Sequence, residues 1–193
     1  MTEELEIEFK NLLSQEHFHS LCNYFSLSEQ DFKQQVNHYF DTDSFTLKDA
    51  GCALRIREKN SKDILTFKQP AAVGILETHQ PLHAQEKEIA LHTGELPPGP
   101  VQEKVEKLIV EGKLAYFGSL TTFRAEKKYK SGLIVLDYSR YLNKEDYEIE
   151  FEVSDYDTGR EQFADLLSSL NIPFTKTKNK VRRFYEQKYQ SFQ

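Results

Sequence analysis

The sequence predicts an α+β fold: a closed antiparallel β-barrel with a polar lumen and amphipathic helices packed on the outside. Two observations predict it. Many extended segments alternate charged and apolar residues, as strands do when one face is polar and the other apolar. At least three other segments repeat apolar residues at helical spacing, and such helices need an apolar surface to cover. A barrel with its charges inside and its apolar face turned to helices satisfies both.

The clearest strand is residues 6–10, reading EIEFK, and its first four letters return at residues 148–151. In an extended strand, neighbouring side chains point to opposite faces. Glu6, Glu8 and Lys10 therefore share one face, and the glutamates of the later copy share a face in the same way. Either strand alone is typical of a solvated sheet surface, but other strands of the chain repeat the arrangement.

The remaining elements follow from periodicity and turn residues. Alternation predicts strands at 4–10, 34–41, 52–58, 64–68, 115–130, 133–138 and 146–153. Helical spacing predicts helices from a Ser14 cap to Phe25, over 101–111 and over 158–170. Charges alternate over 84–91 as in a strand, residues 71–83 carry no clear pattern, and the tail from 175 to 189 is open between helix and strand.

The composition indicates a single domain over residues 1–193, long enough to bury a core. Its 25 basic and 31 acidic residues give a net charge of −6. This argues against general nucleic-acid binding, because such proteins carry a basic excess. No apolar run reaches the ~18 residues of a membrane span, and no signal peptide is evident. Cys22 and Cys52 lack metal-ligand spacing and are expected as buried thiols. We expect a cytoplasmic protein with no membrane partner.

Charged side chains on inner strand faces need compensation, because burying an unpaired charge is costly. Clustered carboxylates repel one another unless a cation lies between them, and Mg²⁺ or Mn²⁺ prefers oxygen ligands. Cations on the same faces suit a small polyphosphate, since arginine can bind phosphate oxygens with two parallel hydrogen bonds. The candidate anions are Glu6, Glu8, Asp137, Glu148 and Glu150. The candidate cations are Lys10, Arg55, Arg57, Lys68, Arg124, Lys180 and Arg183.

This ordered series resembles the CYTH domain family, also called triphosphate tunnel metalloenzymes, and within it the small CYTH proteins of Gram-positive bacteria. The ExExK of residues 6–10 matches the family signature. The resemblance spans nearly the whole chain and continues through YFDT at 39–42, LRIR at 54–57, TFK at 66–68, FR at 123–124, LD at 136–137, ExE at 148–150 and NKxxRF at 179–184.

The resemblance implies an eight-stranded antiparallel tunnel, dependence on a divalent metal and a substrate that carries a triphosphate. It assigns metal binding to Glu6, Glu8, Glu148, Glu150 and Asp137. It assigns phosphate binding to Lys10, Arg55, Arg57, Lys68, Arg124, Lys180 and Arg183. Glu148, Asp137 and Lys10 are the predicted catalytic residues, with a carboxylate such as Glu148 or Asp137 orienting the attacking water.

Two positions depart from the family pattern. Asn179 stands where the family usually has Ser before its Lys-x-x-Arg motif. The segment 86–88 has no clear match to the middle strand of the family, so the directions of its side chains stay open.

Some predicted site residues have a structural alternative. If the tail is helical, Lys180 and Arg183 share one helix face; surface cations near a helix end are the other interpretation. Arg55 and Arg57 could equally be solvated strand arginines. Glu152 continues the inner face of its strand but is not assigned to the metal.

We expect hydrolysis of a terminal phosphoanhydride, with inorganic tripolyphosphate as the leading substrate and phosphate as a product. Phosphoryl transfer depends on positioning and electrostatic stabilisation, which such a site would provide. A class IV adenylate cyclase and a thiamine triphosphatase stay open within the family, although the chain has no Trp to stack on thiamine. A sensor that binds polyphosphate or nucleotide without catalysis is the alternative from another class. A homodimer also stays open.

Overall fold

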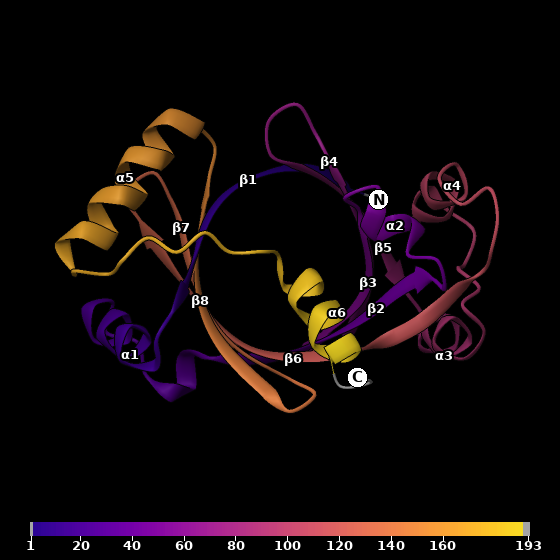
Figure 1. Ribbon diagram of the computed structural model, residues 1–193, viewed down its shortest axis with the longest axis horizontal. Helices are drawn as coiled ribbons and strands as arrows, with labels where there is room; N and C mark the ends of the chain where they lie inside the picture. Colours follow the sequence, from indigo (N-terminus) through magenta and orange to yellow (C-terminus); the bar gives the residue numbers. More distant parts are fainter. Residues whose placement is uncertain (1, 191–193) are drawn as a thin grey trace. The chain divides into compact units, whose positions relative to one another are not determined.

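The structure is a computed structural model that describes residues 2–190. Its eight antiparallel strands follow the order β1-β5-β4-β3-β2-β6-β7-β8 and close into a barrel, as the sequence predicts. The strands are β1 (Thr2–Leu13), β2 (Lys33–Thr42), β3 (Ala53–Lys59), β4 (Lys62–Pro70), β5 (Ile75–Leu82), β6 (Leu114–Tyr129), β7 (Gly132–Tyr141) and β8 (Lys144–Val153). The helices are α1 (Gln15–Tyr24), α2 (Thr46–Asp49), α3 (Ala84–Thr93), α4 (Pro100–Glu106), α5 (Tyr156–Ser169) and α6 (Lys180–Gln190), with a 3₁₀ turn η1 (Glu29–Asp31) (Figure 1).

The chain divides into two compact units. Unit 1 comprises Met1–Leu5 and Gln35–Leu120, and unit 2 comprises Glu6–Gln34 and Thr121–Gln193. Each unit has a hydrophobic cluster of its own. The expectation of one domain over the whole chain stays a prediction.

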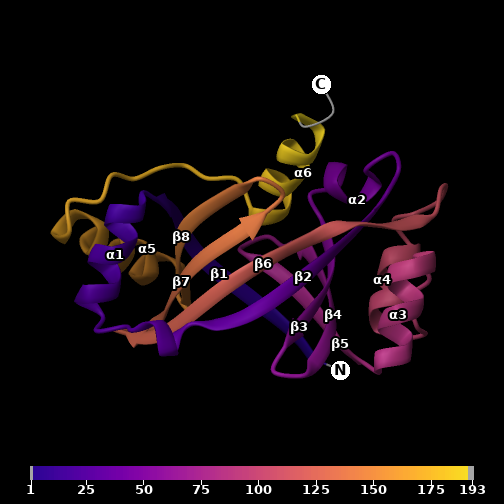
Figure 2. The same ribbon diagram turned by 90° about the horizontal axis from the view of Figure 1, so that it is seen from below.

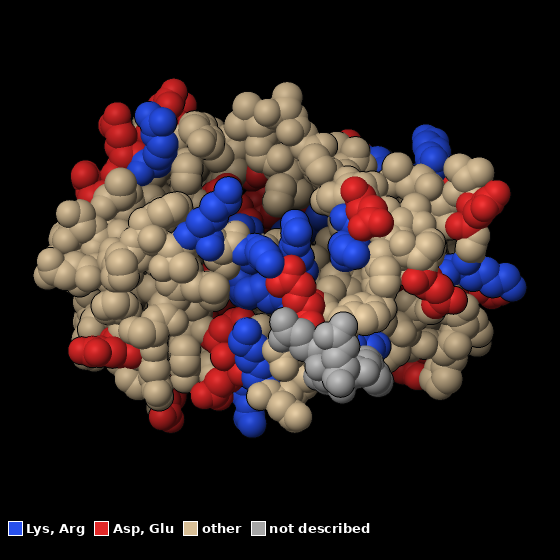
Figure 3. All heavy atoms as spheres, in the orientation of Figure 1, with Lys and Arg blue, Asp and Glu red and all other residues tan. Residues whose placement is uncertain are grey.

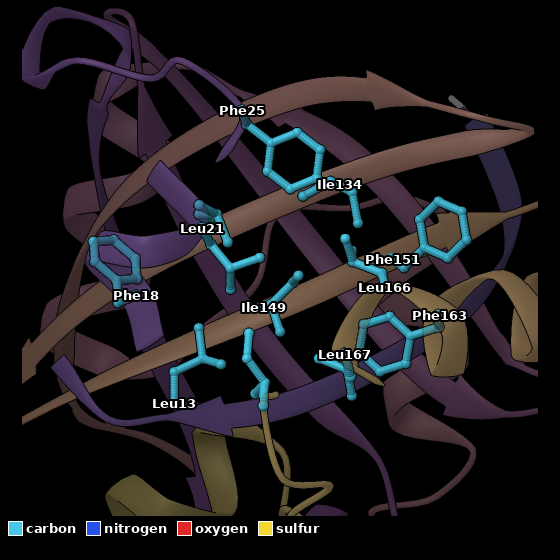
Figure 4. Packing of buried hydrophobic residues seen from close by; sticks show 12 residues of the cluster. Leu13, Phe18, Leu21, Phe25, Ile134, Ile149, Phe151, Phe163, Leu166 and Leu167 are labelled. Carbon is cyan, nitrogen blue, oxygen red and sulfur yellow. The ribbon is translucent and has the colours of Figure 1, made fainter. Parts of the chain in front are cut away.

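In unit 2, α1 and α5 both pack against the apolar face of β8 (Figure 1). Apolar side chains of the two helices meet Ile149 and Phe151 of β8 and Ile134 of β7, all fully buried (Figure 4). Helix α1 begins where the sequence predicts, because Ser14 Oγ accepts a hydrogen bond from His17 N at 3.1 Å, whereas α5 begins two residues before the predicted 158. The Asp155 carboxylate likewise caps α5. The glutamates of β8 therefore lie on the strand face opposite the helices.

In unit 1, α3 and α4 lie side by side, in both views of the ribbon (Figures 1 and 2). Ala90 of α3 and Val101 and Val105 of α4 pack in one cluster with Leu54 and Ile56 of β3. Because side chains alternate along β3, this packing leaves its arginines on the opposite face. The predicted helix over 101–111 is real but shorter, ending at Glu106.

The Asp41 of the YFDT motif has a structural role that its sequence context did not reveal. Its buried carboxylate accepts hydrogen bonds from the backbone N–H groups of Thr42, Leu47 and Lys48 at 2.8–3.0 Å. It thereby holds the short helix α2 against the end of β2, and Leu47 of that helix is buried in the unit 1 cluster.

The strand-like pattern over 84–91 was misleading, because this segment forms α3. The Glu86 carboxylate accepts a hydrogen bond from His83 N at 2.7 Å, which satisfies a donor at the helix start. Gly94 ends the helix at φ 76°, and a Cβ there would lie 1.8 Å from the carbonyl oxygen of Leu114. Capping at both ends thus outweighs an alternation of charges that has no apolar face to bury.

The ambiguous tail forms the helix α6. Asn179 precedes it, and its side-chain oxygen accepts a hydrogen bond from Arg182 N at 2.9 Å. Asn and Ser are both favoured N-caps. The departure from the family pattern at this position therefore preserves the cap.

The expectations about the cysteines and about membrane-spanning segments have these outcomes. Cys52 is buried and Cys22 is half-buried, both as free thiols, so the expectation of buried thiols holds fully only for Cys52. Among residues 2–190, no helix is long and apolar enough to cross a bilayer.

Substituting Leu166→Ala should lower the free energy of unfolding by about 2–5 kcal/mol, because it leaves a cavity where α5 packs on β8. Leu166 is 1% exposed within the unit 2 cluster. Urea denaturation followed by circular dichroism measures the change. Glu161→Ala, at an exposed position of the same helix, is the control and should shift stability by no more than about 0.5 kcal/mol. Equal losses in both variants would contradict the packing described for α5.

Candidate functional site

Two adjacent strands of unit 2 carry the acidic rows predicted from the sequence. In the antiparallel register of β1 with β8, Lys10 lies opposite Glu150 and Glu8 lies opposite Glu152. Side chains directly opposite each other on one face lie close enough to interact. The EIEF repeat therefore brings its two copies onto neighbouring strands with their charged faces together.

Three of the five predicted metal ligands form one tight group. Carboxylate oxygens of Asp137, Glu148 and Glu150 all lie within 4.8 Å of one another. The three residues are 0%, 1% and 6% exposed. Asp137 comes from β7, where it lies opposite Glu148 of β8. Buried carboxylates at this spacing are stable only with cations among them.

Two cations of unit 2, one on a strand and one on a helix, supply that compensation. Arg124 of β6 donates from Nε to Asp137 at 2.8 Å and from Nη2 to Glu150 at 2.7 Å. The Lys180 ammonium contacts Asp137 Oδ2 at 2.8 Å and also contacts Glu148 and Glu150. A single lysine thus bridges all three carboxylates of the group.

Arg183 extends the network, as the helical interpretation of the tail predicts. It lies one turn after Lys180 and donates to Glu148 Oε2 at 2.6 Å and to Asp146 Oδ2 at 3.1 Å. The alternative, that Lys180 and Arg183 are surface cations, is wrong: Lys180 has a side chain only 13% exposed and that of Arg183 is 8% exposed. Figure 3 shows the outer part of α6, where acidic and basic side chains lie next to one another.

The three carboxyls of the group have different proton affinities. Burial raises the pKa of Glu148 to about 7, and the neighbouring Glu150 adds to the rise, against the effect of Lys180 and Arg183. Burial acts in the same direction on Glu150 and Asp137, but Lys180 and Arg124 outweigh it and hold both pKa values below the ordinary range. The site therefore holds two ionised carboxylates beside one that exchanges its proton near neutral pH.

The predicted residues of β1 lie beside this group. The Lys10 ammonium contacts Glu8, and although burial lowers its pKa, Glu8 and Glu150 raise it above the usual value. Glu6 lies further along the same strand face and is half-buried. Among the described residues, Glu6 and Glu8 are not members of the three-carboxylate group, so their role as metal ligands stays a prediction.

Unit 1 carries the other predicted cations on the inner faces of β3 and β4. Arg57 Nε donates to Asn37 Oδ1 of β2 at 2.9 Å. Arg55 lies 3.9 Å from Glu77 Oε2 of β5, and Lys68 contacts the same carboxylate. Arg55 and Lys68 have side chains only 12% and 21% exposed, so they are not solvated strand positions.

Glu77 and His79 are polar residues of this face that the sequence did not predict. His79 Nδ1 lies 3.0 Å from Thr66 Oγ1, and its Nε2 lies 3.4 Å from Glu77. Burial lowers the pKa of His79, and nearby Arg55 acts in the same direction. Their strand lacks an apolar face, which is why alternation gave no signal there. In the register of β4 with β5, His79 lies opposite Thr66 and Glu77 lies opposite Lys68, a pairing that the sequence alone does not give.

Lys87 does not lie on the inner face of β3, β4 and β5. It lies on α3, with its ammonium 3.1 Å from Glu58 and 3.2 Å from Asp63 at the β3–β4 hairpin. The open question about its direction is thus answered by an ion pair that ties α3 to the hairpin.

Comparison with known proteins identifies the family of this chain. The CYTH domain profile matches residues 4–185. The Bacillus subtilis (strain 168) protein named "Putative triphosphatase YjbK" is 53% identical over 99% of this chain and 100% of its own length.

Solved structures show the same fold. The crystal structure of a "putative adenylate cyclase" from Bacillus halodurans has a TM-score of 0.92 and 43% identity, covering 96% of this chain and 100% of that chain. The Hippeastrum protein HpAC1 has a TM-score of 0.78 at 23% identity, covering 95% and 96% of the two chains, and its likeness concerns the fold. On the profile match and the Bacillus relatives together, this chain belongs to the CYTH domain family.

Proposed function

We propose that this protein is a divalent-metal-dependent hydrolase of triphosphate-bearing substrates, with inorganic tripolyphosphate as the leading substrate. The observation that carries the proposal is the buried group Asp137, Glu148 and Glu150, interleaved with Arg124 and Lys180. Buried carboxylates in one group suit a divalent cation, and buried cations next to them suit the phosphates that such a cation accompanies. The name of the Bacillus subtilis relative supports a triphosphatase.

The donor set fits Mg²⁺ or Mn²⁺, since every candidate ligand atom is a carboxylate oxygen. Asp137, Glu148 and Glu150 would hold the ion, with Glu6 and Glu8 as further ligands on β1. When bound, a divalent cation neutralises charge on phosphate oxygens and polarises the phosphorus centre for attack.

The side chains of the site have complementary tasks in hydrolysis. Glu148 would accept a proton from the attacking water through the carboxylate oxygen that it does not give to the ion. Asp137, fixed by Arg124 at 2.6 Å, would orient that water. Lys10 would stabilise the charge that develops on the transferred phosphoryl group.

The remaining cations would bind the phosphate chain. Arg124, Lys180 and Arg183 in unit 2 and Arg55, Arg57 and Lys68 in unit 1 are the proposed phosphate ligands. Arg55 Nε is buried and makes no hydrogen bond within the described residues, so it retains a donor for a ligand. An unsatisfied buried donor is costly unless a ligand uses it.

A class IV adenylate cyclase is the second candidate, favoured by the name of the 43% identical Bacillus halodurans structure. A panel of substrates separates the candidates. The purified protein is incubated with Mg²⁺ or Mn²⁺ and tripolyphosphate, ATP or thiamine triphosphate, and phosphate, pyrophosphate and cyclic AMP are measured.

We expect the fastest turnover with tripolyphosphate, yielding phosphate and pyrophosphate, and none with EDTA present. Cyclic AMP with pyrophosphate from ATP would establish the cyclase instead. Faster turnover of thiamine triphosphate than of tripolyphosphate would identify a thiamine triphosphatase. Tight binding of polyphosphate without any product would indicate a sensor.

Glu8→Gln and Arg57→Ala should each lower kcat/KM for tripolyphosphate by about 10²–10³-fold, as loss of one donor to a developing charge does at other sites. Steady-state phosphate release measures the effect, and circular dichroism checks the fold. Glu161→Gln and Arg160→Ala, both on exposed positions of α5, are matched controls and should retain full activity. If either site variant kept most of its activity, that residue would lose its assignment.

Metal affinity should rise with pH up to about 7 and then level off, because a proton and the cation compete for Glu148. Burial raises the pKa of Glu148 to about 7, so below that pH its proton must leave before the carboxylate can bind metal. The expected loss is up to about tenfold per pH unit on the acid side. Titration calorimetry with Mg²⁺ from pH 5.5 to 8.5 measures it. In Glu148→Gln this part of the pH dependence should disappear; an unchanged profile would exclude Glu148 as its source.

A further inference from the structure

The Lys180 ammonium lies where the proposed metal would bind. It contacts Asp137 Oδ2 at 2.8 Å and one oxygen each of Glu148 and Glu150. These three residues are the group of buried carboxylates whose oxygens lie within 4.8 Å of one another. The lysine side chain is only 13% exposed, so few water molecules can share its charge.

A metal ion bound to the carboxylate oxygens that Lys180 contacts would compete with the ammonium for them. A magnesium ion needs carboxylate oxygens at about 2.0–2.1 Å, and an ammonium hydrogen-bonds the same oxygens at about 2.7–2.9 Å. Both would then lie within a few ångströms of each other at a buried position, where repulsion between like charges is strong.

We infer that Lys180 is a tethered counter-ion that fills the metal position in the metal-free protein, and that divalent-cation binding displaces it together with the first turn of α6. The inference rests on the proposed function, since it needs the metal site that the function requires.

The chain around Lys180 is built so that this exchange is feasible. Lys180 is the first residue of α6, and residues 172–179 before it have no regular secondary structure. The linker is fixed upstream by Asn11, which donates to Pro173 O at 3.1 Å and accepts from Thr175 N at 2.5 Å. After that anchor, the first turn of α6 is held by Arg183, which donates to Glu148 Oε2 and to Lys178 O at 2.6 Å, and by buried Val181, so the exchange requires these contacts to break.

The location of Lys180 also favours its release to an anion. It lies at the N-terminus of a helix, whose dipole disfavours a cation there, and α6 has no acidic residue in its first turn. The carboxylates of the barrel strands are what offset this cost. Once a metal ion neutralises these carboxylates, the Lys180 ammonium would be stabilised by a phosphate oxygen instead. The metal ion would then pair with the carboxylates, and the triphosphate would pair with Lys180.

The test uses Lys180→Met, which keeps the length of the side chain and removes its charge. At pH 8.5 the variant should bind Mg²⁺ alone, with no phosphate present, at least about tenfold more tightly than the natural protein, because a competing cation is gone. Mg²⁺ should also raise the melting temperature of the variant by more than it raises that of the natural protein. Lys178→Met is the matched control: Lys178 pairs with exposed Glu186 at 2.7 Å, and its loss should leave metal affinity unchanged.

A second measurement follows the backbone of α6 by hydrogen exchange. In the natural protein, Mg²⁺ alone should increase hydrogen exchange at the backbone amides of residues 178–184, and in Lys180→Met the metal should have no such effect. Equal or weaker Mg²⁺ binding by Lys180→Met, or unchanged exchange in the natural protein on saturation with Mg²⁺, would overturn the inference while leaving the proposed hydrolase intact. Absence of metal binding in both proteins would overturn the proposed function, and the inference with it.

Discussion

The compensation of buried charge is the constraint on which unit 2 depends. Asp137, Glu148 and Glu150 are withdrawn from water, and each would lose its charge or destabilise the fold without a cation beside it. Arg124 and Lys180 supply those cations. Such networks rarely add stability beyond what apolar side chains of similar volume would give. The cost is intelligible if the charges serve a ligand, and the charges of the proposed triphosphate and divalent cation would match them.

The fold provides this network through the pleat of its strands. Glu148 and Glu150 alternate with Ile149 and Phe151, so the packing that holds α1 and α5 on the outside also fixes which side chains point inward. A slip of one residue in β8 would turn the glutamates into the helix-packed cluster. The apolar cores therefore determine the chemistry of the polar face, and stability and function are set by the same register.

The sequence predicted what its local periodicity encodes. Strands with one apolar face were predicted, and so was the face on which each charged side chain lies, because alternation assigns each side chain to a face. β5 was not predicted as a strand, since Thr78 and Gln80 make its second face nearly as polar as the face of Glu77 and His79. α3 was not predicted, because its charges alternate as in a strand, and it is the caps at its two ends that make it a helix.

The position of Lys180 could not be derived from periodicity, because it depends on contacts between residues far apart in the chain. Its three partners precede it by 30 residues or more, and the linker that delivers it has no regular structure of its own. The family motif identified the residue, whereas only the packed structure shows that its charge lies among all three carboxylates. α6 begins with cations that its own dipole disfavours, so the acidic strands stabilise its docking together with the burial of Val181, Phe184 and Tyr185. Whatever changes the charge of those strands must therefore act on α6 as well.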